Sequence, residues 1–228
     1  MCLPTAERLE RGLFISLSAV ALQAVHDAEV KLGDAVSVHG MGAIGLMAIQ
    51  MCQLEGIQNV YAVDPDPARR ALALKFGATD VLDPSAEEVG LAIRELNQGH
   101  GVDVAIDVSG SDRGLQGALA AAGLGATVVA AGFYQGGAAN LNLGEEFHHN
   151  RLSIIASIGG WGTPNRHAPL WDRRRVLSVA TRLLYTDRVS VDGLLSRTFP
   201  FGEAHAAYEW LDGHPQDAVK VALDYGTP

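Results

Sequence analysis

The chain has 228 residues, 48% of them hydrophobic and 19% charged, which is enough to bury the core of one large domain, alone or with a small appendage. Its 26 acidic and 17 basic residues give a formal net charge of -9. Because the sequence has no compact basic stripe, nucleic acid is excluded as a partner, and the charge is too small and dispersed for a solvating tail.

The cysteine content and the N-terminal residues favour a reducing cytosolic compartment. The two cysteines, Cys2 and Cys52, lie far apart, which is neither the paired spacing of a metal site nor a disulfide framework. Residues 1–11 alternate charged and apolar side chains and lack the apolar core of a signal peptide, and no apolar run is long enough to span a bilayer. We therefore expect a cytoplasmic protein with no membrane partner.

The first elements alternate between helix and strand. Apolar residues at three- and four-residue spacing predict a lead-in helix over residues 18–28, in a segment 1–30 that precedes the main domain. The segment 35–39, Ala-Val-Ser-Val-His, predicts a short strand buried on both faces. A glycine-rich turn follows, then a helix to about Leu54 and a second strand at 59–64.

The same alternation continues to about residue 160. We expect further helices over 67–76, 87–96 and 113–122 and further strands over 81–82, 102–107, 126–131 and 152–158. Six short strands joined by helices imply an α/β fold with a doubly wound parallel sheet, the Rossmann fold, over residues 31–160.

The texture of the chain changes after residue 160. A polar loop extends to Pro169, and helices over 172–184 and 203–211 alternate with apolar runs at 195–199 and 219–224. This C-terminal α+β tail, residues 161–228, need not belong to the sheet.

A glycine motif directly follows the first predicted strand and opens the next helix. Its first glycine permits a tight turn, its second lets the backbone approach a pyrophosphate, and its third lets helix and strand pack closely. The pyrophosphate would lie over the first amides of the helix, which lack partners within the helix and carry its positive dipole end. The motif is Gly40, Met41, Gly42, Ala43, Ile44 and Gly45.

Asp64 ends the second strand nineteen residues after Gly45, where a carboxylate can accept hydrogen bonds from an adenosine ribose and would repel a 2′-phosphate. We therefore expect NAD rather than NADP, although Arg69 and Arg70 lie nearby and could offset part of the repulsion. The alternative for Asp64 is a helix-capping or turn residue before Pro65.

These segments resemble the medium-chain dehydrogenase/reductase family of zinc-type alcohol dehydrogenases, in particular its sorbitol- and threonine-dehydrogenase-like members. Further matching stretches are 19–25, 32–36, 76–78, 102–110 and 199–201, so the resemblance covers nearly the whole chain. It implies that Arg69 packs near the adenine and that Ser109, Gly132 and Phe133 approach the nicotinamide. The alternative for Ser109 and Gly132 is that they simply end strands.

Departures from the family limit what the resemblance implies. Members normally begin with a catalytic domain that supplies zinc ligands and much of the substrate pocket, and we expect this chain to start too late to contain it. Ser16 stands where many sorbitol-type members place a glutamate beside the catalytic zinc. The adjacent pair His148 and His149 has no third ligand at a recognised spacing, and His39 is expected to be a packed strand residue. We predict no zinc site and assign no catalytic residue.

Three functions remain open. The leading one is an oxidoreductase module with hydride transfer between an alcohol or carbonyl and a nicotinamide cofactor, inactive unless a catalytic domain is supplied in trans. The second is a non-catalytic dinucleotide-binding fragment or sensor. The third is an S-adenosylmethionine-dependent methyltransferase, because such folds also place a glycine turn after the first strand and an acidic residue after the second.

The resemblance also implies how the tail and the sixth strand are used. The runs 195–199 and 219–224 would be strands of the absent catalytic lobe, and residues after about Val189 should then be held less stably than the sheet. Family members commonly pair through the edge strand of this domain, so a homodimer through residues 152–158 is expected.

Overall fold

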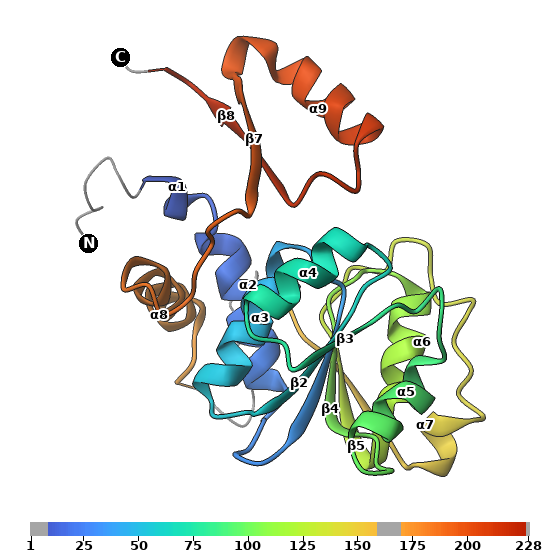
Figure 1. The fold of residues 1–228 in the computed structure, drawn as a ribbon. Coiled ribbons are helices and arrows are strands. Elements are labelled where there is room, and N and C mark those ends of the chain that lie inside the picture. Colours follow the sequence, from blue (N-terminus) through green and yellow to red (C-terminus); the bar gives the residue numbers. More distant parts are fainter. Residues whose placement is uncertain (1–8, 159–169, 227–228) are drawn as a thin grey trace.

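The computed structural model describes residues 9–158 and 170–226, and its centre is a six-stranded parallel sheet (Figure 1). The strand order, β3-β2-β1-β4-β5-β6, is that of a dinucleotide-binding sheet wound in both directions from its middle. The predicted Rossmann fold is confirmed. The strands are β1 (Ala35–His39), β2 (Asn59–Val63), β3 (Asp80–Leu82), β4 (Val102–Asp107), β5 (Ala122–Ala130) and β6 (Ser153–Ala156).

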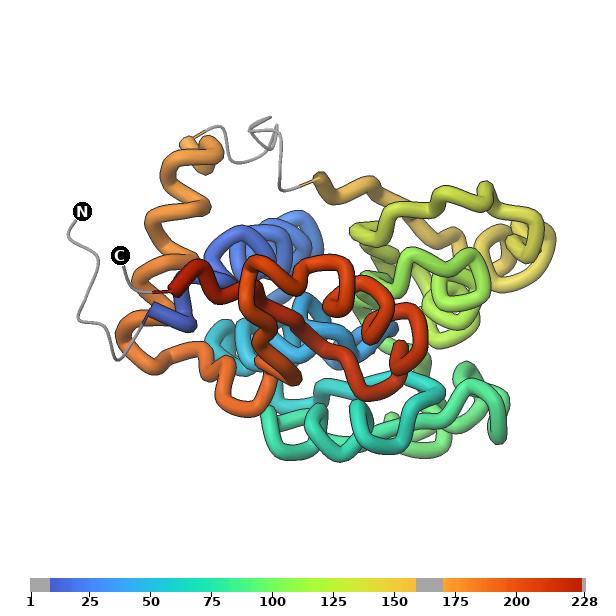
Figure 2. The backbone as a smooth tube through the Cα atoms, turned by 90° about the horizontal axis from the view of Figure 1, so that it is seen from above, coloured from blue at the N-terminus to red at the C-terminus, as the bar shows by residue number. Residues whose placement is uncertain are grey.

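Helices cover both faces of this sheet (Figures 1 and 2). One hydrophobic cluster joins a sheet face to α2 (Ile15–Asp27), α3 (Ala43–Leu54), α4 (Pro67–Lys75) and α8 (Arg173–Tyr185). The other face packs against α5 (Val89–Leu96) and α6 (Asp112–Ala121). Every residue of β1 is buried, as expected for a central strand of a parallel sheet, and its two polar side chains, Ser37 and His39, lie 3.0 Å apart at Ser37 Oγ and His39 Nε2.

The lead-in segment and the first helix of the tail share one core. Helix α8 packs along α2, and its apolar face, Val176, Ala180 and Leu184, belongs to the same cluster as α3 and β1. Near the end of α8, Arg11 of the short α1 (Leu9–Gly12) donates to the carbonyl of Leu184 at 2.6 Å. Part of the C-terminal tail therefore stabilises the face of the sheet that carries α2.

The last strands form a separate two-stranded parallel sheet. It consists of β7 (Leu195–Pro200) and β8 (Lys220–Asp224), joined by the 3-10 turn η2 (Phe201–Glu203) and α9 (Ala204–Gly213). This C-terminal unit, residues 195–224, stands above the edge at which β1 and β2 end, and seen from above it crosses the middle of that edge (Figures 1 and 2). It thus borders the edge where ligands bind in open α/β sheets.

A buried amide fixes the connection between α8 and this unit. The side chain of Gln50 in α3 donates to the carbonyl of Ser190 at 3.0 Å and accepts from its N–H at 2.7 Å. Such a two-point bond to the backbone pairs both polar ends of the amide in an otherwise apolar core.

Element boundaries differ from prediction mainly where glycine is dense. Strand β5 begins at Ala122 rather than Ala126, because the backbone at Ala122 pairs with Val102 across an irregularity in the ladder. Two four-residue helices, α1 and α7 (Glu146–His149), were not expected from periodicity. The predicted loop at 161–169 and Cys2 lie outside the described residues. No helix in the described ranges has the length and apolar composition needed to cross a membrane.

Candidate functional site

The turn between β1 and α3 admits only glycine at two of its positions. Gly40 has φ +97, and a Cβ there would lie 2.8 Å from the Cα of Ser109. At Gly45 a Cβ would lie 2.0 Å from the carbonyl oxygen of Gly40. The first glycine therefore allows the turn after β1 to touch the turn after β4, and the last allows α3 to pack onto its own turn.

A side chain at Gly42 would meet no steric obstacle among the described residues. Among the described residues no heavy atom lies within 4 Å of a Cβ built at this position, and its backbone, with φ -76 and ψ -173, would accept any residue. Gly42 precedes Ala43 and Ile44 at the start of α3, and no side chain caps this helix. The beginning of a 12-residue helix, with its partial positive charge, therefore borders open space.

Asp64 lies just after β2 and is only 5% exposed. Its Oδ2 accepts from the N–H of Met41 at 2.7 Å, and its Oδ1 accepts from the N–H of Asp66 at 2.8 Å. The carboxylate therefore holds the glycine turn against the end of β2. The cap of α4 is not Asp64 but Asp66, whose Oδ1 accepts from the N–H groups of Ala68 and Arg69.

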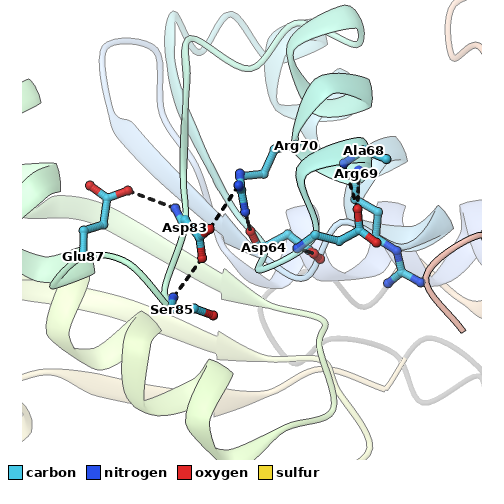
Figure 3. Close-up of polar contacts among 8 residues, drawn as sticks. Asp64, Ala68, Arg69, Arg70, Asp83, Ser85 and Glu87 are labelled. Carbon is cyan, nitrogen blue, oxygen red and sulfur yellow. Dashed lines mark hydrogen bonds and ion pairs between the residues drawn. The ribbon is translucent and has the colours of Figure 1, made fainter.

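Arg70 is committed to neighbouring groups (Figure 3). It donates to the carbonyl of Asp64 at 2.7 Å and forms an ion pair with Asp83 at 3.0 Å. Asp83 in turn accepts from the N–H of Ser85, and its own N–H donates to Glu87. The guanidinium thus braces the ends of β2 and β3 and already has a carboxylate partner.

Arg69 points the other way, toward the C-terminal unit. Its Nη2 donates to the carbonyls of Pro215 at 2.9 Å and Ala218 at 3.2 Å. Its Nε is buried and has no hydrogen-bond partner within the described part of the chain. The side chain of Arg69 thus links α4 to the loop that leads into β8.

A buried carboxylate marks the end of β4. Asp107 is 0% exposed and accepts from Ser109 Oγ at 2.7 Å and from the hydroxyl of Tyr134 at 2.5 Å. Burial raises the pKa of Asp107, and the two hydroxyls oppose that rise. Burial and the nearby Asp107 raise the pKa of Tyr134. Tyr134 therefore stays protonated and remains a hydrogen-bond donor to the carboxylate.

The turn after β5 packs on the turn after β4. A Cβ at Gly132 would lie 2.5 Å from the backbone nitrogen of Gly110, and the N–H of Gly132 donates to the carbonyl of Asp107 at 3.0 Å. Next to it, the side chain of Phe133 is 80% exposed. The structure therefore brings Gly40, Ser109 and Gly132 together along one edge, with Asp64 beside Gly40.

The sequence analysis missed Asp107 and Tyr134 as members of this site. Asp107 carried a signal, because an acidic residue ending an apolar strand needs a partner when it is buried. Tyr134 carried none, because its bond to Asp107 joins residues 27 positions apart.

His39 is a packed residue that directly precedes the glycine turn. It is buried at the end of β1, its Nε2 lies 3.0 Å from Ser37 Oγ, and burial lowers its pKa to about 3. Within the described ranges no three His, Cys, Asp or Glu side chains form a group that could hold a metal ion. The site therefore offers backbone amides at the start of α3, glycines that let the turns approach closely, and the two carboxylates of Asp64 and Asp107. The free amides suit binding of an extended anionic ligand.

Comparison with known proteins gives one family. The model described as "Zinc-binding dehydrogenase" matches residues 43–173. The D-guloside 3-dehydrogenase of Shigella flexneri is 31% identical over 224 residues, 98% of this chain and 64% of its own length. The D-guloside 3-dehydrogenase of Escherichia coli (strain K12) is 34% identical over 206 residues, 90% of this chain and 59% of its own length.

A solved structure agrees with these matches. A zinc-binding dehydrogenase from Sinorhizobium meliloti 1021, bound to NADP, superimposes with a TM-score of 0.73 and 28% identity. The superposition covers 86% of this chain and 54% of that protein. The chain thus spans somewhat more than half the length of the relatives it matches.

Proposed function

Because the chain belongs to the zinc-binding dehydrogenase family and carries the nucleotide-binding domain of a zinc-type alcohol dehydrogenase-like oxidoreductase, we propose that a nicotinamide dinucleotide binds along the carboxyl edge of its sheet. The observation that carries this proposal is the turn after β1. Two of its glycines are required by close packing, while Gly42, at the start of α3, borders open space.

We assign the ligand's parts to residues of this chain. Gly40, Gly42 and Gly45 shape the turn, and the amides of Ala43 and Ile44 hold the pyrophosphate. Asp64 accepts hydrogen bonds from the hydroxyls of the adenosine ribose. Its carboxylate has lone pairs free for this, because the N–H groups of Met41 and Asp66 use only two of them. Ser109, Gly132 and Phe133 border the nicotinamide, and Arg69 closes the adenosine end beside the C-terminal unit.

We propose NAD rather than NADP as the cofactor. The carboxylate of Asp64 would face a 2′-phosphate, and Arg70, the nearby cation, is paired with Asp83. Arg69 is directed to carbonyls of the C-terminal unit. The Sinorhizobium meliloti dehydrogenase was solved with NADP bound. A preference for NAD in this chain would follow from the carboxylate of Asp64.

The chemistry of the module follows from its family. When bound, the nicotinamide accepts or donates a hydride; the residues named above bind it, orient it and exclude water. Among the described residues no three His, Cys, Asp or Glu side chains are grouped so that they could hold zinc. We propose that the alcohol, by likeness to the D-guloside 3-dehydrogenases, is a glycoside hydroxyl, and that residues beyond this chain, in cis or in trans, complete its pocket.

Calorimetric titration with NADH and NADPH tests the proposal, using the wild-type chain and Asp64→Asn. Asp64 also accepts from the N–H of Met41, so damage to the glycine turn would lower the affinities for NADH and NADPH equally. Loss of the negative charge alone would raise the affinity for NADPH relative to that for NADH. We expect wild-type to prefer NADH and the ratio to shift toward NADPH by about ten-fold or more in the variant. Absence of binding by wild-type contradicts the proposed function, and an unchanged ratio contradicts the role of Asp64.

Two alternatives predict other results. A sensor or non-catalytic fragment would bind NADH yet show no turnover even when a catalytic domain is supplied in trans. A methyltransferase would bind S-adenosylmethionine and not NADH, but both the strand order and the family match favour the dinucleotide.

A further inference from the structure

Backbone contacts and the side chain of Tyr134 connect the turn after β5 to the end of β4. Gly110 and Gly132 pack backbone to backbone, and a Cβ at either would crowd the other turn, at 2.5 Å for Gly132 and 3.3 Å for Gly110. Glycines place no side chain in this contact and are the most flexible residues in a chain. Tyr134 donates from this turn to Asp107, at the end of the neighbouring strand β4.

The anchor of this bond is rigid. Asp107 is fully buried, its backbone carbonyl accepts from the N–H groups of Ala131 and Gly132, and its carboxylate accepts from Ser109. A hydrogen bond to a buried carboxylate is stronger than one between neutral groups, because the charge has no water to replace a lost donor. Removing the tyrosine hydroxyl would leave Asp107 short of a donor and the turn without a side-chain tether.

The same anchor reaches the glycine turn. Ser109 donates to Asp107, and the backbone of Ser109 lies against Gly40, where a Cβ would come within 2.8 Å. On the helix side, a Cβ at Gly114 would lie 2.1 Å from Ser109 Oγ, so α6 closes over the serine. The series Tyr134, Asp107, Ser109 and Gly40 therefore fixes the spacing between the turns after β5 and β1.

We propose that Tyr134 is a positioning residue for the nicotinamide half of the dinucleotide, holding the Gly132–Phe133 turn through Asp107 and Ser109 at a set distance from the glycine turn. This inference rests on the proposed function, since it assigns the two turns to the two ends of one ligand. Tyr134 does not act on the reacting atoms. Its hydroxyl acts through the buried carboxylate.

The test compares two ligands in two variants. Tyr134→Phe removes only the hydroxyl, and Tyr208→Phe, at a side chain 69% exposed on α9, is the matched control. NADH and ADP-ribose, which lacks the nicotinamide, are titrated into each protein by calorimetry, at a temperature where each variant is folded. The fluorescence of NADH on binding is followed in parallel as a second report on the nicotinamide.

We expect Tyr134→Phe to lower the affinity for NADH by about ten-fold, which is the size of effect expected from one hydrogen bond to a charged group. The affinity for ADP-ribose should stay within about two-fold of wild-type. The fluorescence change of bound NADH should shrink, and Tyr208→Phe should match wild-type. Equal losses for both ligands, or no loss, would overturn the positioning role. If wild-type itself bound neither ligand, the proposed function would fail instead.

Discussion

The glycines of the turn after β1 serve different purposes: Gly45 is required by close packing, whereas Gly42 borders open space. Substitution by alanine distinguishes the two. Gly42→Ala adds a methyl group to open space on a permitted backbone, so the free energy of unfolding should change by less than about 0.5 kcal/mol while NADH affinity falls at least about ten-fold. Gly45→Ala forces a Cβ onto the carbonyl of Gly40 and should cost about 3 kcal/mol or more.

Urea unfolding and NADH titration of the two variants check this contrast. A Gly42→Ala protein that is stable and still binds NADH normally would show that the open space is not where the ligand lies. A Gly45→Ala protein as stable as wild-type would contradict the packing described for α3.

His39 should make the fold sensitive to acid. Its pKa is about 3 in the folded chain against an ordinary value of 6.5, so between these values the unfolded chain binds a proton that the folded chain does not. Stability from this residue is therefore complete above about pH 6.5 and falls as the pH drops toward 3, by up to about 1.4 kcal/mol per pH unit.

Free energies of unfolding of His39→Gln and wild-type at several values between pH 7 and pH 4 test this linkage. The variant should lose less stability than wild-type over the interval, even if it starts lower because its side chain packs less well against Ser37. His205→Gln, at an exposed site on α9, is the control. Parallel pH profiles for wild-type and His39→Gln would contradict the account.

Residues of the site could be predicted where local spacing determines them. Gly40 and Asp64 were found because a strand, a turn and a second strand follow in order, and Asp64 indeed lies against the turn. The Tyr134–Asp107 bond and the bonds of Arg69 to Pro215 and Ala218 could not be, because they depend on how distant segments pack. The ligand roles of these residues remain predictions.

At the scale of elements, hydrophobic periodicity predicted the sheet well because a parallel sheet buried on both faces needs apolar strands. It failed at α1 and α7, where four residues are too few to establish a period, and at the start of β5, where Gly123 and Gly125 imitate a loop. Pairing with β4 overrides the local preference of these glycines.

Arg69 should control how firmly β8 is held. Arg69→Ala removes the bonds to Pro215 and Ala218, so amide exchange in Lys220–Asp224 should become about ten-fold faster while exchange in β1 and β4 is unchanged. Arg94→Ala is a matched control, because Arg94 also donates to two carbonyls, those of Gly90 and Ala120, far from β8.

Hydrogen exchange read by mass spectrometry on wild-type and both variants decides the matter. In wild-type, residues after about Val189 should already exchange faster than the six-stranded sheet. Equal protection of the two regions in wild-type, or no effect of Arg69→Ala on β8, would contradict this description of the C-terminal unit.

At the scale of the whole molecule, β6 is an edge strand that pairs only with β5 among the residues that the structure describes. Ile154 and Ile155 are half-buried, and Ile158, just beyond the strand, is 59% exposed. An apolar edge of this kind can pair with a second copy of itself. We expect a homodimer at micromolar concentration by light scattering and a monomer for Ile158→Glu; a monomeric wild-type chain would contradict the pairing.

The central claim, that a nicotinamide dinucleotide lies along the carboxyl edge of the sheet, is tested most directly by NMR titration of the labelled chain with NADH. The account predicts the largest amide shifts at Ala43 and Ile44, with further shifts at Ser109 and Gly132. Shifts confined to other regions, such as α9, or no shifts at saturating NADH, would contradict it.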